Sequence, residues 1–400
     1  MPVPDEEFLN TLVARVMRVE SITRGDPQRH AWLMRYRGHI VGDTALAYSQ
    51  LEAALKPYRL TPLFRHGRGH KHEILLVPSL PEAPPSRPLW NAVLFVLTVV
   101  SVFAAGVSYA YQGPADFGNG ARDALREALP GGLAFTVSLL AILLAHEFGH
   151  YLAARRHGTA VSLPYFLPFP FSLFGTLGAF INLKAPPRDR RALLDIGLAG
   201  PIAGMVVAVP VLLIGLSLSA LEPLPRYLPE GSGLMLEGNS VLYLLAKFAV
   251  FGKLLPAPAH YAGSPLLHWL RFFFTGQPVP LGGMDVFLHP VAWAGWAGLL
   301  VTALNLIPLG TLDGGHVLYS LLGARARGLF WPLLGVLALL GLVWDGWWLW
   351  AFLLIFLGRR YAEPLDDVTP LDGKRRALAI FGMVLFLLVF TPVPLQMVGF

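Results

Sequence analysis

The chain of 400 residues contains no cysteine. This absence excludes a disulfide framework, a thiolate nucleophile and any zinc site with sulfur ligands, so a metal would be held by nitrogen and oxygen atoms. Charged residues are also scarce, at 14% of the chain, whereas soluble domains carry about 25%. Hydrophobic residues make up 54%, and the net charge of +6 is too modest to indicate a nucleic-acid partner. This composition predicts a mainly α, polytopic helical membrane protein.

The N-terminal region differs from the rest because charged residues interrupt its apolar positions. The pattern predicts three short strands and one helix, at residues 31–34, 60–64, 73–77 and 44–55. Asp43 or Thr44 is the expected N-cap of that helix. A Pro-rich run at residues 78–88 is typical of a semi-stiff linker. We therefore predict a small soluble α+β domain over residues 1–85 and a membrane-embedded domain over residues 86–400.

Seven apolar segments follow, and most approach the length of about 20 residues that a helix needs to cross a bilayer. They lie at residues 88–110, 132–154, 192–219, 289–309, 328–344, 346–358 and 377–395. A further segment, 239–252, is short and contains Lys247. If it does not cross, all the basic clusters that flank the helices lie on one side, which the positive-inside rule assigns to the cytoplasm. We therefore predict about seven spans, with 239–252 at the outer interface and the N-terminal domain in the cytoplasm.

One apolar segment carries a metal-binding pattern, His-Glu-Phe-Gly-His, at residues 146–150. Positions i and i+4 lie on one face of a helix, so His146 and His150 can hold one ion together while Glu147 lies beside it. A charged group inside hydrocarbon costs about 3 kcal/mol even on insertion scales, and a bound cation is the simplest compensation. The pattern predicts a zinc hydrolase within the bilayer, and two packing histidines with a protonated Glu147 are the alternative.

A catalytic zinc site usually takes three protein ligands and leaves one position open. The motif NLIPLGTLDGGH at residues 305–316 offers Asp313, which follows an apolar helix broken by a proline and a glycine. In the seven-span topology both motifs lie toward the cytoplasmic ends of their helices. His146, His150 and Asp313 can therefore meet at one depth in the membrane.

These two motifs resemble those of the site-2 protease family of intramembrane zinc metalloproteases. That family joins a membrane-embedded H-E-x-x-H to a distant N-x-x-P-x-x-x-L-D-G. The stretches GTLGAFIN at 175–182 and AGPIAG at 199–204 also resemble family features. No PDZ-like insertion is recognisable at 220–287, so the chain is most similar to the PDZ-lacking branch with plastid and bacterial members. The resemblance implies an endopeptidase that cleaves single-span membrane proteins near the cytoplasmic face, in regulated intramembrane proteolysis.

The resemblance also implies roles for individual residues. One Zn²⁺ would bind His146, His150 and Asp313, and Glu147 would act as general base and then as general acid. Asn305 is a candidate hydrogen-bond donor to the oxygen that gains negative charge. An alternative role for this amide is to cap the broken helix end.

A transmembrane helix hides its peptide bonds in its own hydrogen bonds, so a protease must first unwind it. Residues 174–183 have the composition of an edge strand that could hold the unwound segment by strand addition. A hairpin that only packs against the core is the alternative. The small residues of 199–204 predict close helix packing, and Asp195, near a helix start, is not expected to bind metal. His316 is expected either to contact Asp313 or to pack at an interface.

Four tryptophans, at positions 344, 347, 348 and 350, are typical of an aromatic belt at the membrane surface. Three other functions compete with the protease. A catalytically inactive membrane chaperone or assembly factor of the same fold would not need the complete set of polar residues. A metal transporter would spread them over several helices, and a zinc peptidase with a glutamate as third ligand would not need the L-D-G motif.

Overall fold

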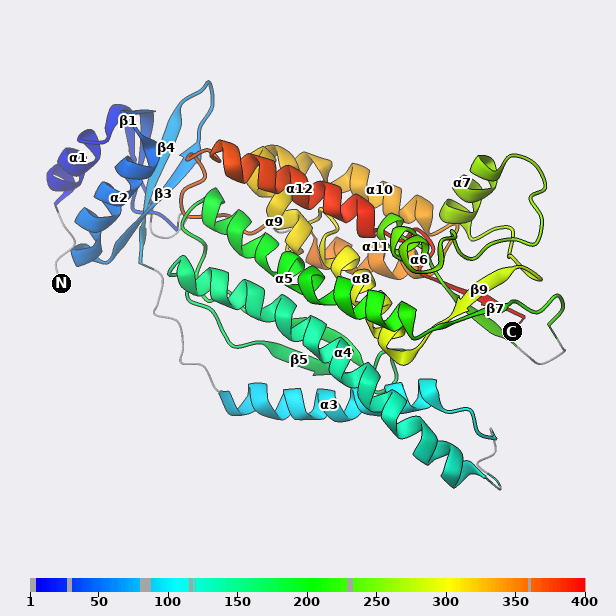
Figure 1. The fold of residues 1–400 in the computed structure, drawn as a ribbon. Coiled ribbons are helices and arrows are strands. Elements are labelled where there is room, and N and C mark those ends of the chain that lie inside the picture. The colour runs from blue at the N-terminus through cyan, green and yellow to red at the C-terminus, as the bar shows by residue number, and fades with distance from the viewer. Residues whose placement is uncertain are drawn as a thin grey trace.

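The computed structural model describes residues 5–26, 31–79, 88–114, 118, 120–228, 233–358 and 361–399. Figure 1 shows a small sheet domain at the N-terminal end and a bundle made mostly of helices beyond it. The fold is thus mainly α with a small N-terminal sheet domain, as the sequence predicts. The expected domain boundary between residues 85 and 86 and most of the Pro-rich run lie outside the described residues.

The N-terminal domain consists of a four-stranded antiparallel sheet, in the order β1-β2-β4-β3, with two helices packed against it. Its elements are α1 (Glu6–Ala14), β1 (Met17–Arg24), β2 (Met34–Ile40), α2 (Thr44–Leu55), β3 (Leu60–His66) and β4 (His72–Pro78). The predicted helix α2 is confirmed, and the Asp43 carboxylate caps it by accepting a hydrogen bond from the backbone N–H of Leu46 at 2.8 Å.

The strand predictions were right for β3 and β4 and wrong for the first strand. Residues 31–34 were expected to form a strand, whereas β2 runs over Met34–Ile40. Met34 and Tyr36 face the core, and the charged side chains between and after them point away from it. The predicted strand was ended at these charged residues, although a strand with one buried face has alternating apolar and polar side chains. β1 was missed because almost all of its side chains are exposed, which leaves no apolar pattern to detect.

The rest of the chain is dominated by helices (Figure 1). They are α3 (Pro88–Ala110), α4 (Ala121–Arg156), α5 (Arg190–Ser217), α6 (Val241–Phe251), α7 (Pro265–Thr275), α8 (Pro290–Asn305), α9 (Asp313–Leu322), α10 (Phe330–Leu340), α11 (Gly346–Leu357) and α12 (Gly373–Val389). Among the described residues, four stretches are long and apolar enough to cross a membrane: α3, α4, α5 and the continuous stretch Asp313–Leu340. These stretches identify a membrane protein.

The expected number of about seven spans is not confirmed. The segment 289–309 forms a helix of only 16 residues, α8, because the chain turns after Asn305. That length covers about 24 Å, less than the roughly 30 Å of a bilayer core. α11 is shorter still, at 12 residues, and α10 reaches a spanning length only as part of the continuous stretch Asp313–Leu340. Helices of this length need other elements to complete a crossing.

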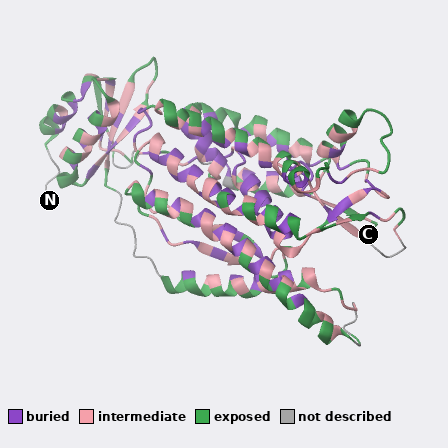
Figure 2. Cartoon of the chain, in the orientation of Figure 1, coloured by how far each residue is buried: buried purple, intermediate pink, exposed green. Residues whose placement is uncertain are grey.

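The centre of the bundle is formed by α4, α5 and α8, which pack along one another. Small residues allow the close approach: a Cβ atom on Gly149 of α4 would lie 2.5 Å from the backbone oxygen of Ala199 on α5. Small residues at helix contacts are the usual means of packing in lipid. Figure 2 shows the consequence, with buried residues along the inner sides of these helices and exposed residues along the outer sides.

Three two-stranded antiparallel sheets lie among the helices. They pair β5 (Tyr165–Pro168) with β6 (Thr176–Phe180), β7 (Ala220–Pro223) with β9 (Met284–Phe287), and β8 (Leu234–Glu237) with β10 (Leu395–Val398). The predicted strand at 174–183 is therefore present as β6. Among the described residues only β5 pairs with β6, so one edge of β6 is open to another strand.

The α6 segment packs into the protein through a buried lysine. Lys247 is 0% exposed, and its Nζ lies 3.7 Å from Glu237 Oε1 and 4.3 Å above the ring of Tyr243. Burial, together with the nearby Asp285, raises the pKa of Glu237 to about 7. With 11 residues, α6 has about half the length of a membrane span, which agrees with the expectation that residues 239–252 do not cross.

A segment from the far end of the chain attaches the N-terminal domain to the helices. We call residues 365–368 the clasp. The backbone N–H of Phe64 in β3 donates to the oxygen of Leu365 at 3.0 Å, and the N–H of Asp367 donates back to the oxygen of Phe64 at 3.1 Å. The side chain of Val368 is buried in the core of the N-terminal domain. The clasp thus extends the sheet at β3 and holds the domain against the end of the helical bundle.

Candidate metal centre and active site

Three predicted side chains converge, although they come from two distant helices. His146 and His150 lie one turn apart on α4 and are buried, and Asp313 is the first residue of α9. The two Nε2 atoms are 3.1 Å apart, and each lies 3.2 Å from Asp313 Oδ2. In a tetrahedral site with bonds of about 2.0–2.1 Å, neighbouring ligand atoms are roughly 3.3 Å apart. The three atoms could therefore hold one metal ion.

The tautomer of His150 suits metal binding. Its Nδ1 lies 2.7 Å from the backbone oxygen of Ile196 on α5. A carbonyl oxygen only accepts hydrogen bonds, so Nδ1 carries the proton and the lone pair of Nε2 is directed toward His146 and Asp313. The sequence contains no signal for this contact, because any residue at position 196 would supply the same backbone oxygen.

Gly200 leaves the space that the His150 ring occupies. A Cβ atom at this position would lie 2.1 Å from His150 Nε2. The small residues of 199–204 predict close helix packing, but they did not predict this second role of Gly200. The i, i+4 spacing of Gly200 and Gly204, which matches that of His146 and His150 on the facing helix, is the signal that could have revealed it.

Glu147 lies beside the three converging residues and is 4% exposed. Its Oε2 atom is buried and has no hydrogen-bond partner among the described residues. Leaving a carboxylate oxygen unpaired in such a place is costly. Two imidazoles, a carboxylate and an orphaned carboxylate oxygen around one cavity together fit a divalent cation with an associated water molecule.

Asn305 brings the second motif into contact with the first. It is the last residue of α8, and its Nδ2 lies 3.3 Å from His146 Nε2. Asn305, Glu147 and the three converging residues line one cavity of about 190 Å³. A water molecule occupies about 30 Å³ in the liquid, so the cavity has room for several waters or for a short piece of backbone.

Two other residues from the sequence analysis lie nearby. His316 lines the same cavity and packs its Cβ against Gly197 of α5. Asp195 is not part of the cavity: it accepts hydrogen bonds from Arg375 at 2.7 Å and from His157 at 2.9 Å. Its charge is therefore balanced by the ion pair with Arg375, which joins α5 to α12.

Strand β6 forms one wall of the cavity through Ala179 and Phe180. The end of β6 therefore lies beside Glu147 and His146. The predicted substrate strand and the candidate metal centre thus share a wall.

The model of Peptidase family M50 matches residues 134–331 of this chain. The chain is 31% identical over 265 residues to a protein of Arabidopsis thaliana named probable zinc metalloprotease EGY1, chloroplastic, covering 65% of this chain and 43% of that protein. The EGY1 protein of Oryza sativa subsp. japonica is 31% identical over 332 residues, covering 78% and 52%. The protein named EGY2 of Arabidopsis thaliana is 31% identical over 282 residues, covering 69% and 44%.

The chain thus spans about half the length of the curated relatives that it matches. No solved structure matches it significantly. The region matched by the family model contains both motifs and the helices that bring them together. Residues 134–331 therefore form a domain of peptidase family M50, the site-2 protease family of zinc metalloproteases.

Proposed function

We propose that the chain is a zinc-dependent endopeptidase that hydrolyses peptide bonds within or beside the transmembrane segments of membrane proteins. One observation carries this proposal: two imidazole nitrogens and a carboxylate oxygen from distant motifs meet at 3.1–3.2 Å, next to the buried Glu147. Apolar helices surround this group. The M50 domain and the names of the relatives support the same activity.

The proposed site divides the chemistry between a metal and the side chains. His146, His150 and Asp313 would hold one Zn²⁺, for which nitrogen and oxygen ligands are suitable. When bound, zinc polarises a carbonyl and makes water more acidic. Glu147 takes a proton from the attacking water and returns it to the leaving amine nitrogen. Asn305 donates a hydrogen bond through Nδ2 to the oxygen on which negative charge develops.

The substrate would be a single-span membrane protein whose helix unwinds at the site. An unwound segment has unpaired backbone groups that need partners inside the membrane. The open edge of β6 offers such partners and ends in the wall of the cavity that contains Glu147. Strand addition to this edge would present a peptide bond to the site. The basic residues Arg155 and Arg156 at the end of α4 favour a site near the cytoplasmic face, with the N-terminal domain on the same side.

The test uses the purified full chain in liposomes with a single-span substrate that carries a fluorescent tag. Glu147→Gln is expected to lower cleavage by about 10²–10⁴-fold, because the proton acceptor is lost. Asn305→Ala is expected to lower it by about 10²-fold. Both variants should retain zinc, measured by elemental mass spectrometry. Phe148→Ala is the control, since Phe148 lies on the same helix but is exposed and outside the cavity.

Cleavage by Glu147→Gln at the wild-type rate would contradict the proposed chemistry. A wild-type protein that binds zinc and captures substrates without cleaving any would favour the other function, a catalytically inactive membrane chaperone or assembly factor of the same fold.

A further inference from the structure

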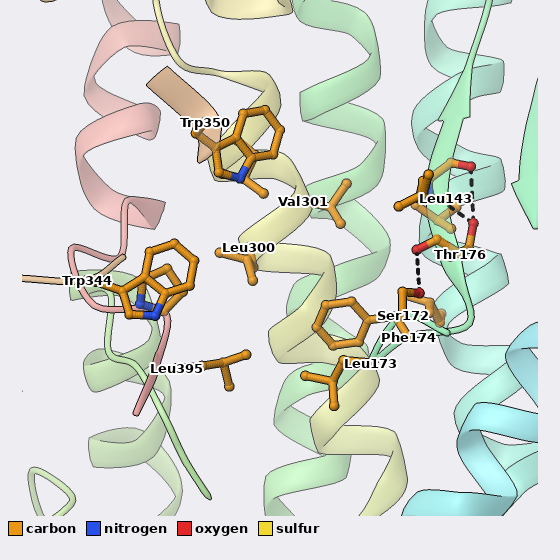
Figure 3. Close-up of a pocket in the computed structure, with 15 residues that line it drawn as sticks. Leu143, Ser172, Leu173, Phe174, Thr176, Leu300, Val301, Trp344, Trp350 and Leu395 are labelled. Carbon is orange, nitrogen blue, oxygen red and sulfur yellow. Dashed lines mark hydrogen bonds between the residues drawn. The ribbon is translucent and has the colours of Figure 1, made fainter. Parts of the chain in front are cut away.

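A second cavity, of about 290 Å³, lies beside the first and contains none of the proposed metal-binding or catalytic residues. We call it the apolar cavity. Its walls come from α4, from α8, from the loop before β6 and from the region around the turn between α10 and α11. In Figure 3, Trp344 and Leu395 lie across from Phe174 and Thr176, with Leu300 of α8 between them in this view.

The chemistry of the apolar cavity fits a hydrocarbon group. Its few hydroxyl groups are already engaged: Ser172 Oγ donates to the backbone oxygen of Thr176 at 3.1 Å, and Thr176 Oγ1 donates to that of Leu167 at 2.8 Å. Most of the remaining lining is aliphatic or aromatic. A charged or strongly polar ligand would lose its hydration here without gaining partners.

The tryptophans around this cavity depart from the expected aromatic belt. Trp347 is 1% exposed, and its Nε1 donates to the backbone oxygen of Pro392 at 2.6 Å. Trp344 and Trp350 line the apolar cavity. Only Trp348, with 48% of its surface exposed, has the exposure expected of a belt residue. Two of the four rings therefore shape an internal space.

Three elements run from the apolar cavity to the proposed active site. On α4, Leu139 and Leu143 line the cavity and precede Glu147, by about 12 and 6 Å along the helix axis. On α8, Leu304 lines the cavity and directly precedes Asn305. On β6, the first residues line the apolar cavity and the last residues line the site cavity. The two cavities are thus consecutive along the same strand.

We propose that the apolar cavity is a specificity subsite that receives one large aliphatic or aromatic side chain of the substrate's transmembrane segment. A strand of about 3.3 Å per residue covers the distance to Glu147 in roughly two to four residues. The recognised residue therefore lies about two to four positions from the cleaved bond, on the side that extends toward the middle of α4. This inference rests on the proposed function, because it requires a substrate strand along β6.

The acyl chain of a lipid has the same chemistry and is the other candidate occupant. The position of the cavity favours the substrate. Thr176 and Gly178 at the start of β6 line the cavity, so a peptide paired with that strand would carry its side chains past the opening. Binding of a lipid tail would not require the cavity to lie along the strand that leads to Glu147.

The experiment compares substrates that differ at one position. Starting from a single-span substrate that the wild-type protein cleaves, each residue within about six positions of the cleaved bond is changed to Ala or to Phe. We expect Phe to be cleaved about tenfold faster than Ala, in kcat/KM, at one position two to four residues from the bond. Val301→Trp should reduce cleavage of that Phe substrate to the rate of the Ala substrate, because the indole fills the cavity.

A matched control is Val137→Trp, since Val137 lies on α4, is 60% exposed and does not line the cavity. It should keep the preference for Phe. A second cavity variant guards against misfolding of the first: Leu300→Ala enlarges the space and should shift the preference from Phe toward Trp. Both variants are judged by the ratio of two substrates, which does not depend on the fraction of folded protein.

Three results would overturn the inference while leaving the proposed function intact. The wild-type protein could cleave all substrates of the series equally, or Val301→Trp could keep the Phe preference while Leu300→Ala fails to shift it. The third is loss of a co-purified lipid from Val301→Trp with an unchanged Phe preference, which would assign the cavity to an acyl chain. If the wild-type protein cleaves no substrate at all, the proposed function fails, and the inference fails with it.

Discussion

The N-terminal domain and the helical bundle both have apolar cores, but they differ in the side chains that they expose and in the polar groups that they bury. In the domain, Ile74 and Leu76 of β4 are fully buried, as expected of a sheet that faces water. In the bundle, α4 exposes Leu133 and Val137 by 57% and 60% and buries polar groups such as Glu147. Leucine on the outside costs nothing where lipid is the solvent, whereas polar groups must find partners inside.

This difference agrees with the location of the proposed active site in the bundle. The core of a small soluble domain is filled by apolar side chains. The core of the N-terminal domain consists of such side chains. The helices around α4 and α5 instead approach through small residues, which leaves room for imidazoles between them. The clasp joins the two regions, and each can be perturbed separately.

The largest effect on zinc binding and cleavage is expected from filling the space beside the proposed metal ligands. Gly200→Ala places a Cβ atom 2.1 Å from the position of His150 Nε2, and the ring cannot move away without losing its hydrogen bond to Ile196. We expect at least a tenfold loss of bound zinc and a comparable loss of cleavage. Val206→Ala is the control, because Val206 lies on the same helix and is 68% exposed. A Gly200→Ala protein with its full zinc content would contradict the assignment of Gly200.

The second prediction concerns stability and compares the same substitution in the two regions. Leu76→Ala removes a side chain that is 0% exposed and should cost about 2–5 kcal/mol of unfolding free energy in the N-terminal domain. Leu133→Ala changes a side chain that is 57% exposed on α4 and should cost less than about 1 kcal/mol. Denaturant unfolding monitored by hydrogen exchange measures both. Equal costs would mean that the two regions do not differ as described.

The smallest effect is expected at the junction of the two regions. Val368→Ala removes two methyl groups from the core of the N-terminal domain, at about 0.8 kcal/mol each. The backbone N–H of Phe64, which bonds to the clasp, should then exchange its hydrogen roughly tenfold faster in a mass-spectrometric measurement. Val41→Ala provides the comparison, since Val41 is 63% exposed in the same domain. An unchanged exchange rate at Phe64 would show that the clasp does not hold the domain.

Patterns that repeat within a helical turn were predictable. The helix over residues 44–55 was predicted with its cap, and the apolar segment 88–110 coincides with α3. Strands with exposed side chains, such as β1, could not be predicted, because their stability comes from pairing with a neighbouring strand and not from an apolar pattern of their own. The strand predicted at 174–183 is present but shorter: β6 covers Thr176–Phe180, and the residues on either side of it form loops.

The amino-acid sequence by itself determined which residues face one another across a single turn, as His146 and His150 do, because the period of a helix is a local property. It also determined the lipid setting, because composition decides which solvent a segment tolerates. The sequence predicted that Asp313 meets these histidines, and the tertiary structure gave the distances; only the tertiary structure decided that Ile196 orients one of them and that β6 joins two cavities. Contacts of this kind depend on how whole helices pack against one another. Many residues determine that packing together, so a short sequence pattern does not predict it.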